Sequence, residues 1–235
     1  MIQVRGCQTS IKILKANMFT GIVRGMGDVI SRRERDRLIT FEIDAHNFAG
    51  GFFHRSKIGA SVSISGVCLS VAERKGTVLT FDVMEESLIK TTLDSLYPGD
   101  KINIEPSFKA GDDVGGHILS GHVIDSAEII EIEIRGDVTV MTFKHDPAWT
   151  AYIFEKGFIA LDGCSLTIVD ADDLTSTFKV HLIPETMRRT TFGLKKKGDS
   201  VNLEIDSRIQ AIVETARRMK VAEDSALDDH YQGLN

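Results

Sequence analysis

The chain has 235 residues, of which 42% are hydrophobic and 26% charged, with 20 Gly and only 4 Pro. This usage excludes a collagen-like or disordered chain, and the length predicts one large domain or two small ones. The 28 basic against 34 acidic residues give a net charge of −6, so no basic field covers the whole chain to attract nucleic acid or an anionic membrane. We therefore expect small molecules or proteins as partners, with no nucleic acid and no membrane.

The three cysteines, Cys7, Cys68 and Cys164, form no CxxC pair and lie far apart in the sequence. This spacing is typical of neither a zinc knuckle nor a secreted disulfide framework. No run approaches the roughly 18 apolar residues needed to span a bilayer, and residues 1–17 lack the apolar region of a secretory signal. These features predict a cytoplasmic protein without a metal site.

The sequence contains an internal duplication. TTLDSLYPGDKINIE at 91–105 aligns with TTFGLKKKGDSVNLE at 190–204, and SISGVCLSV at 63–71 aligns with ALDGCSLTI at 160–168. Nearer the start of each copy, FTGIV at 19–23 parallels LSGHV at 119–123. We expect two tandem units, residues 18–113 and 114–206, preceded by an extension at 1–17 and followed by a helix and tail at 207–235.

Strands are predicted where apolar residues alternate with polar ones between turn residues. The candidates in chain order are 38–43, 62–71, 78–84, 102–105, 138–143, 158–161, 177–183 and 201–205. Short strands at such close spacing favour barrels. Helical patterns are scarce and occur at 46–55, 146–156 and 208–223.

The last of these helical segments carries an apolar stripe at helical spacing, formed by Ile209, Ile212, Val213, Ala216 and Met219. Asp206 and Ser207 precede it as candidate N-caps. The stripe either packs on its own barrel or bundles with other copies of the chain, and the sequence does not choose between the two.

Two histidines lie among glycines in GGHILSGHV at 115–123. Zinc binding is a weak interpretation because no acidic or cysteine ligand lies at zinc spacing nearby. We expect His117 to be a structural hydrogen-bonding residue. His122 differs, because its match in the first copy is the apolar Ile22, and an imidazole at one of two matched positions can orient or carry a proton.

Two further pairs of polar residues are matched in the duplication. Cys68 and Ser165 place a small nucleophilic or hydrogen-bonding side chain at one point of each unit, although a buried structural thiol is the alternative for Cys68. Glu86 and Glu185 could accept hydrogen bonds from a polyol or a ring, and a solvated strand end is their alternative. The chain has no GxSxG, GxGxxG, P-loop or HExxH motif, which argues against hydrolases, kinases, Rossmann enzymes and metalloproteases.

Six motifs, MFTGIV, SGVCLSV, GGHILSGHV, ALDGCSLTI, HLIPETMRRTTFG and VNLEID, occur in this order and together resemble riboflavin synthases over residues 18–219. The resemblance implies an all-β fold of two tandem six-stranded Greek-key barrels with a C-terminal helix. It implies a cofactor-free reaction in which one 6,7-dimethyl-8-ribityllumazine donates a four-carbon unit to a second, giving riboflavin and 5-amino-6-ribitylaminouracil. It further implies a homotrimer assembled by the helix, with the N-barrel of one subunit facing the C-barrel of its neighbour, and leaves open an association with lumazine synthase.

The same resemblance assigns roles to individual residues. His122 takes part in proton transfer or stabilises the substrate anion, Cys68 lies beside the reacting ring, and Ser165 positions or activates a water. Phe19 packs near the active site, and Asp206 is the acidic residue that ends VNLEID. Substrate-holding residues implied for the N-barrel are Gly21, Ile22, Val23, Cys68, Leu69, Ser70, Asp82, Val83, Met84, Glu85, Glu86 and Ser87. Those implied for the C-barrel are Gly121, His122, Val123, Ser165, Leu166, Thr167, His181, Leu182, Ile183, Pro184, Glu185 and Thr186, with Lys156 as a further binding position.

The chain departs from the family at its start, because riboflavin synthases begin at the MFTG motif whereas 17 residues precede Met18 here. Either translation starts at Met18, or the extension is translated and folds away or serves in targeting. Lumazine proteins and yellow fluorescent proteins are an alternative of the same fold that binds a lumazine or flavin without catalysis. They typically lose one pocket and the histidine motif, which this chain keeps. A flavin-reductase barrel is a weaker alternative, because the chain lacks a nicotinamide-binding domain.

Overall fold

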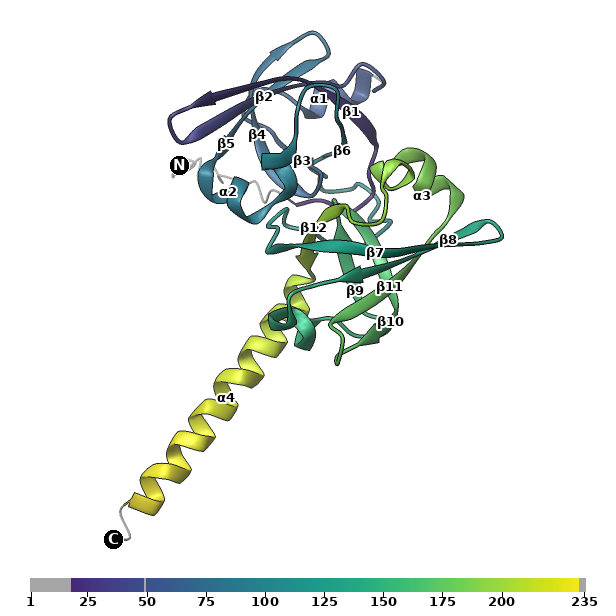
Figure 1. Cartoon of the computed structure of the whole chain (residues 1–235). Coiled ribbons are helices and arrows are strands. Elements are labelled where there is room, and N and C mark those ends of the chain that lie inside the picture. The colour runs from purple at the N-terminus through teal and green to yellow at the C-terminus, as the bar shows by residue number, and fades with distance from the viewer. Residues whose placement is uncertain (1–17, 49, 233–235) are drawn as a thin grey trace, which may run out of the picture.

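The computed structural model of the chain describes residues 18–48 and 50–232. The expected extension at 1–17 lies outside these residues. The described chain forms two closed six-stranded barrels followed by a long helix (Figure 1), which confirms the expected fold class. The N-barrel contains β1 (Gly25–Arg35), β2 (Leu38–Asp44), β3 (Ser61–Ile64), β4 (Val67–Lys75), β5 (Val78–Met84) and β6 (Lys101–Pro106). The C-barrel contains β7 (Asp125–Arg135), β8 (Val138–Lys144), β9 (Phe158–Leu161), β10 (Cys164–Asp172), β11 (Thr177–Leu182) and β12 (Ser200–Ile205).

Both barrels have the same strand order. In the N-barrel it is β1-β2-β5-β4-β3-β6, and the C-barrel repeats it with β7-β8-β11-β10-β9-β12. All pairings are antiparallel, and β2 pairs with β5 rather than with β3, which is the Greek-key arrangement. Closure leaves no strand edge exposed in either barrel.

Strand β10 was not predicted from the sequence, and the run predicted at 62–71 is two strands, β3 and β4. Strands β1 and β7 were also not predicted. Their second halves carry exposed charged residues, such as Arg33 and Glu34 in β1 and Glu133 and Arg135 in β7, so apolar residues do not mark their full length. The predicted strands agree with the observed ones to within one or two residues at most ends, and 78–84 coincides with β5.

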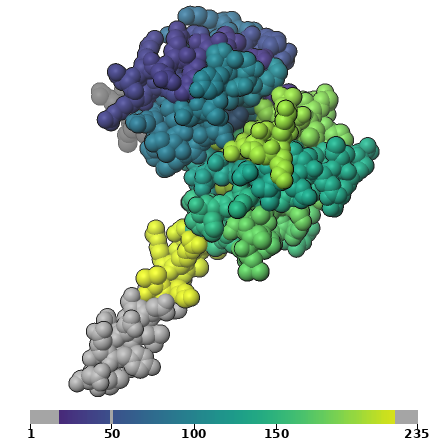
Figure 2. Space-filling view, in the orientation of Figure 1, coloured from purple at the N-terminus to yellow at the C-terminus, as the bar shows by residue number. Residues whose placement is uncertain are grey.

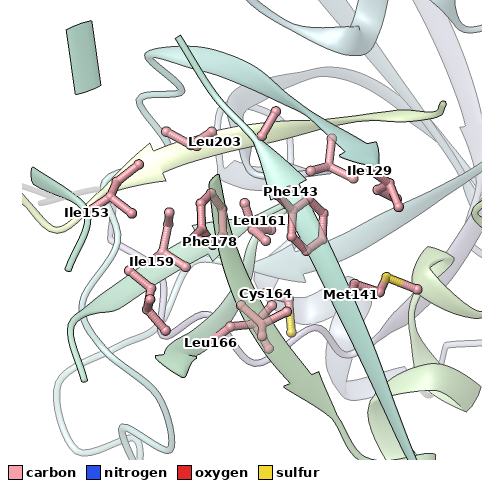
Figure 3. Close-up of a cluster of buried hydrophobic side chains, with 14 of the residues drawn as sticks. Ile129, Met141, Phe143, Ile153, Ile159, Leu161, Cys164, Leu166, Phe178 and Leu203 are labelled. Carbon is pink, nitrogen blue, oxygen red and sulfur yellow. The ribbon is translucent and has the colours of Figure 1, made fainter. Parts of the chain in front are cut away.

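A closed barrel of six strands has an interior that side chains fill. In the C-barrel, Phe143 and Phe178 are paired across β8 and β11 with ring centroids 5.3 Å apart, and Ile129, Leu161 and Leu203 close around them (Figure 3). Phe41 and Phe81 form the equivalent cross-strand pair in the N-barrel, both at most 2% exposed. Each barrel therefore has its own core.

Short helices link the strands. They are α1 (Gly50–Arg55), α2 (Glu85–Lys90) and α3 (Pro184–Arg189), with the 3-10 helices η1 (Thr92–Ser95), η2 (Pro147–Tyr152) and η3 (Thr191–Leu194). The helix expected at 146–156 is only the 3-10 segment η2, which starts at Pro147 and is capped by Asp146. Helices α2 and α3 were not predicted, so Glu86 and Glu185 lie on helices rather than at solvated strand ends.

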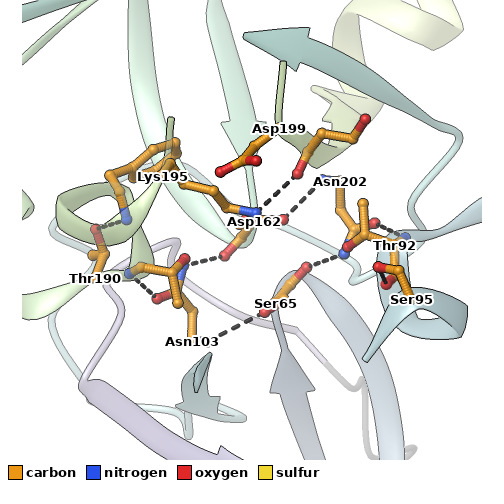
Figure 4. A network of polar contacts seen from close by, with 12 residues as sticks. Ser65, Thr92, Ser95, Asn103, Asp162, Thr190, Lys195, Asp199 and Asn202 are labelled. Atoms are coloured by element: carbon orange, nitrogen blue, oxygen red, sulfur yellow. Dashed lines mark hydrogen bonds and ion pairs between the residues drawn. The ribbon is translucent and has the colours of Figure 1, made fainter. Parts of the chain in front are cut away.

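Two asparagines join the barrels. Asn103 of β6 donates from Nδ2 to the Asp162 carbonyl at 3.0 Å and accepts from the Thr191 N–H at 2.8 Å. Asn202 of β12 makes the reciprocal pair, donating to the Ser65 carbonyl at 2.7 Å and accepting from the Thr92 N–H at 2.7 Å (Figure 4). Both asparagines are 1% exposed. The duplicated sequence therefore folds into a junction with approximate two-fold symmetry.

At the centre of this junction, Gly66 and Gly163 come together. Both have positive φ, +88° and +78°, and a Cβ on Gly66 would lie 2.8 Å from the backbone nitrogen of Gly163. Only glycine allows this approach, which explains why the repeat carries glycine at both positions.

The long helix α4 (Ser207–Gln232) leaves the C-barrel and projects away from both barrels (Figures 1 and 2). The sequence left open whether its apolar stripe packs on its own barrel or contacts other copies of the chain, and only part of the stripe packs on the barrel. Ile209 and Val213 pack against the C-barrel core, whereas Ile212 and Met219 are 65% and 61% exposed. Within residues 18–48 and 50–232 no helix is both long and apolar enough to cross a membrane.

Candidate active site

The segments that precede the two barrels cross over. Phe19 and Leu119 form an antiparallel bridge in which each N–H donates to the other carbonyl at 2.9 Å. Both side chains are buried, at 1% and 3% exposure. From this bridge the chain beyond Phe19 runs along the C-barrel, and the chain beyond Leu119 runs along the N-barrel.

Two buried glutamates hold these crossing segments. Glu105, at the end of β6, accepts from the N–H and hydroxyl of Thr20 at 2.7 Å each and from the Gly21 N–H at 3.1 Å. Glu204, at the same place in β12, accepts from the N–H and hydroxyl of Ser120 at 2.7 and 2.8 Å and from the Gly121 N–H at 3.1 Å. Burial raises the pKa of both carboxyl groups, and these hydrogen bonds oppose the increase.

The two glycines that follow have positive φ and touch the neighbouring barrel. The Ser165 N–H donates to the Gly21 carbonyl and the Cys68 N–H donates to the Gly121 carbonyl, both at 2.9 Å. A Cβ on Gly21 would lie 2.4 Å from the Cβ of Ser165, and one on Gly121 would lie 2.5 Å from the Cβ of Cys68. The crossing segments are therefore packed directly against the two candidate reactive side chains.

One cavity opens beside each of these contacts. The N-barrel cavity, of about 330 Å³, is lined by Val67, Cys68, Glu86, Ser87, Lys90 and Thr91 together with Gly121, His122 and Val123. The C-barrel cavity, of about 210 Å³, is lined by Cys164, Ser165, Glu185, Thr186, Arg189 and Thr190 together with Gly21, Ile22 and Val23. Position by position the two linings match in the duplication, with His122 in place of Ile22 and Cys68 in place of Ser165.

The predicted assignment of segments 21–23 and 121–123 to the two cavities was wrong. The resemblance placed 21–23 with Cys68 and 121–123 with Ser165, because each segment belongs to the same repeat as that residue. The bridge between Phe19 and Leu119 exchanges them, so His122 lies in the cavity of Cys68 and Ile22 in that of Ser165. Sequence order within a repeat could not reveal this crossing.

The remaining candidate residues are not among those that line the two cavities. Leu69, Val83, Leu166 and Leu182 point into the barrel cores, whereas Met84 and Ile183 are exposed. Asp82 accepts a hydrogen bond from Thr40 at 2.7 Å, and Lys156 pairs with its neighbour Glu155 at 3.7 Å with most of its side chain exposed. Phe19 packs with Leu119 and Ala160 against Cys68. Asp206 is 3% exposed and pairs with Arg208 at the start of α4.

The thiols in the two cavities are in the protonated form at neutral pH. Burial raises the pKa of the Cys68 thiol, a hydrogen bond with Ser61 opposes this increase, and Glu204 makes a smaller contribution in the same direction as burial. Burial raises the pKa of Cys164 to about 12. Neither thiol is a ready thiolate nucleophile.

Two pairs of residues at the site were missed in the sequence. Glu105 and Glu204 end the aligned segments 91–105 and 190–204, and Thr91 and Thr190 begin them, so conservation between the two copies was the available signal. His117, interpreted as structural, is 3% exposed and its Nδ1 lies 2.6 Å from the Ser165 Oγ. In the described part of the chain, no three His, Cys, Asp or Glu side chains are arranged to hold a metal ion.

Known proteins are similar to this chain in sequence and in architecture. The lumazine binding domain family matches twice, at residues 20–107 and 120–206. The riboflavin synthase of Escherichia coli (strain K12) is 41% identical over 215 residues, covering 90% of this chain and 97% of that protein. The chain belongs to the riboflavin synthase family. Within the family, the riboflavin synthase of Chlamydia pneumoniae is 39% identical over 202 residues, covering 86% of this chain and 96% of that protein.

Solved structures of the same fold include LumP complexed with 6,7-dimethyl-8-(1'-D-ribityl) lumazine and LumP complexed with riboflavin. Their TM-scores are 0.71 and 0.72, their sequence identities 23% and 24%, and they cover 80% and 79% of this chain and 99% and 98% of their own chains. At this level of identity the likeness is one of fold. The riboflavin synthase relatives are closer in sequence and carry the family assignment.

Proposed function

We propose that this protein is a riboflavin synthase that converts two molecules of 6,7-dimethyl-8-ribityllumazine into riboflavin and 5-amino-6-ribitylaminouracil. The observation that carries the proposal is the pair of matched cavities, each built from one barrel and the crossing segment of the other. A reaction between two copies of one substrate needs two like sites that hold both copies in reactive geometry. The sequence identity to riboflavin synthases supports the same reaction.

Roles for the cavity residues follow from their chemistry. We assign proton transfer or stabilisation of the substrate anion to His122, which is exposed at the N-barrel cavity. The Cys68 thiol, kept protonated by burial, serves as a weak hydrogen-bond donor beside the ring rather than as a thiolate. Ser165 presents a hydroxyl in the C-barrel cavity. No cofactor enters this scheme.

The remaining substrate contacts are proposed from the family resemblance. Glu86 and Ser87 on α2, and Glu185 and Thr186 on α3, line the cavities and offer oxygen atoms to a polyol chain. Phe19, Lys156 and Asp206 are proposed to act nearby, Phe19 through its packing against Cys68 and Asp206 through its charge.

We further propose a homotrimer in which the N-barrel cavity of one subunit faces the C-barrel cavity of the next. The exposure of Ile212 and Met219 on a helix that projects from the barrel supports this assembly, because exposed apolar side chains on one helix face are typical of a contact surface. A cytoplasmic location and an association with lumazine synthase remain predictions from the sequence and the resemblance.

The test is to incubate the purified full-length chain with 6,7-dimethyl-8-ribityllumazine, without cofactor or metal, and to record the visible spectrum. We expect one riboflavin to form for every two lumazines consumed. A spectral shift without consumption, also seen with a chain that begins at Met18, would instead indicate a lumazine-binding protein without catalysis. Riboflavin formation only by the shorter chain would support the function and locate a block in residues 1–17.

A further inference from the structure

Ser165 and His117 are in unusually close contact beside the C-barrel cavity. His117 Nδ1 lies 2.6 Å from Ser165 Oγ, and the His117 backbone N–H donates to the same oxygen at 3.2 Å. The imidazole is 3% exposed and stacks on Phe158, with ring centroids 5.2 Å apart and planes 22° from parallel. The imidazole ring is therefore held in place, and Ser165, which lines the C-barrel cavity, lies between the ring and the cavity.

The direction of this hydrogen bond depends on the tautomer of His117. A separation of 2.6 Å falls within the usual range for hydroxyl donors. We infer that Ser165 donates its proton to Nδ1, and the tautomer test below decides this. Since one lone pair of Oγ already accepts from the backbone N–H, the other remains for a group bound in the cavity.

Burial of the His117 side chain favours the neutral ring. Burial lowers its pKa, Asp206 raises it, and Arg208 opposes Asp206. Both charged groups lie at the start of α4, where they are paired with each other. In the neutral ring with Nδ1 accepting, Nε2 carries the proton, and this buried atom has no hydrogen-bond partner among the described residues. His117 is thus a base whose basic nitrogen points at Ser165.

We propose that Ser165 and His117 form a proton relay that serves the C-barrel cavity, an inference that rests on the proposed function. A C–H bond of the lumazine held there breaks, its electron pair stays on the substrate, and the proton joins Ser165 Oγ. The former hydroxyl proton of Ser165 moves to His117 Nδ1. The imidazolium holds the proton near Asp206 until the reverse transfer returns it to the product. His117 is a positioning residue in this scheme, because it acts through Ser165.

The duplicated sequence does not repeat both members of the relay. Cys68 of the N-barrel cavity matches Ser165. Extending the alignment of 19–23 with 119–123 by two residues matches His117 with Asn17, which lies outside the described residues. An asparagine side chain cannot accept a proton at neutral pH. The two cavities therefore differ in proton chemistry, with His122 on one side and the relay on the other.

Three variants and one matched control test the relay. His117→Asn keeps an amide oxygen that can accept from Ser165 but cannot take the proton, Ser165→Ala removes the first member, and their double variant tests coupling. His145→Gln removes a different buried histidine, whose Nδ1 is bonded to the Asp146 carbonyl away from the cavities. Rates, pH profiles and lumazine affinities are measured for all four.

We expect His117→Asn to lower kcat by about 10²-fold or more, as loss of acid–base catalysis does, with lumazine affinity little changed. The acid limb of the wild-type pH profile should disappear, and the double variant should be no slower than the slower single variant. His145→Gln should keep both rate and profile. If the His117→Asn variant keeps the wild-type kcat, His117 is only a structural hydrogen-bond partner and the relay is wrong.

The tautomer of His117 gives a readout that does not depend on turnover. In protein with ¹⁵N-labelled histidine, long-range ¹H–¹⁵N spectra should show the proton on Nε2, with the assignment made by comparison with His117→Asn. A proton on Nδ1 would overturn the relay even in an active enzyme. If the wild type forms no riboflavin, the proposed function fails, while the tautomer still tests the contact between Ser165 and His117.

Discussion

Glu105 and Glu204 each hold a segment that serves the cavity of the other barrel. Glu105 stands in the N-barrel and fixes Thr20 and Gly21, which lie against Ser165 of the C-barrel. Glu204 stands in the C-barrel and fixes Ser120 and Gly121, which lie against Cys68 of the N-barrel. A substitution at either glutamate should therefore alter ligand binding in the cavity of the other barrel.

The first prediction uses this exchange. Glu105→Ala leaves three buried donors without an acceptor, each worth about 1–3 kcal/mol, so the segment at 20–23 should detach locally and lumazine binding at the C-barrel cavity should weaken at least tenfold. Glu204→Ala should weaken the N-barrel cavity instead. Fluorescence titration with lumazine should show one tight site in place of two for each variant. Glu133→Ala, in the exposed half of strand β7, is the control and should leave both sites unchanged. Loss of the cavity in the same barrel as the mutation would contradict the exchange.

The second prediction concerns pH and stability at His117. Burial lowers the pKa of this imidazole from its usual 6.5, so below pH 6.5 the unfolded chain binds a proton that the folded chain does not. Its contribution to stability is therefore complete above pH 6.5 and declines as pH falls toward the lowered pKa, by at most about 1.4 kcal/mol per pH unit.

Urea denaturation between pH 5 and 7.5 should show this decline in the wild type and in Ser165→Ala, which keeps the imidazole. His117→Asn should have a flatter profile over the same range. An equal slope in His117→Asn and in the wild type would mean that His117 titrates alike in the folded and unfolded chain.

Much of the fold was readable in the sequence because the duplication and the alternating strands follow from local rules. Strands such as β5 have period-two patterns, and the matched glycines Gly66 and Gly163 mark the junction where the barrels touch. Strands β1 and β7 escaped prediction because their exposed halves are charged. Helices α2 and α3 escaped because six residues are too few to show a helical period.

Part of the two cavity linings was predictable from the sequence, but the grouping of the segments was not. The matched pairs Cys68 with Ser165 and Glu86 with Glu185 do line cavities. The bridge between Phe19 and Leu119, however, joins two apolar residues that are far apart in the sequence. No local sequence pattern predicts such a bridge. His117 is buried and hydrogen-bonded as expected, but its partner Ser165 could not be predicted because it comes from another part of the sequence.

A third prediction tests the protonated state of Cys68. Because burial raises its pKa, alkylation by iodoacetamide at pH 7.5 should be slower than in the urea-unfolded chain, since the thiolate is the reacting form. Cys164, with its pKa raised to about 12 and its side chain buried, should react more slowly still. Peptide mass spectrometry distinguishes the cysteines, and saturating lumazine should protect Cys68. Alkylation of Cys68 in the folded chain at the unfolded rate would contradict the protonated thiol.

A fourth prediction addresses the junction between the barrels. Asn103→Ala removes the acceptor of the Thr191 N–H and the donor to the Asp162 carbonyl, leaving two buried polar groups unpaired at about 1–3 kcal/mol each. We expect a loss of about 2–4 kcal/mol in the free energy of unfolding, measured by urea denaturation, and a similar loss for Asn202→Ala. Asn47→Ala, at an exposed asparagine, should change stability by less than about 0.5 kcal/mol. A mild effect of Asn103→Ala would mean that water replaces the lost contacts.

The last prediction concerns helix α4 and the proposed trimer. Ile212→Glu combined with Met219→Glu places two charges on the exposed part of the apolar stripe, while Ile209 and Val213 continue to pack on the C-barrel. Burying unpaired carboxylates between helices is strongly unfavourable, so sedimentation should show a smaller assembly than for the unchanged chain.

Lumazine should still bind to the separated subunits, because each cavity is complete within one chain. Riboflavin formation should fall steeply, because two lumazines then no longer meet across a subunit boundary. Lys220→Glu, a charge change on an exposed side chain of the same helix, is the matched control. An active enzyme of reduced mass would show that the two cavities of a single chain suffice for the reaction.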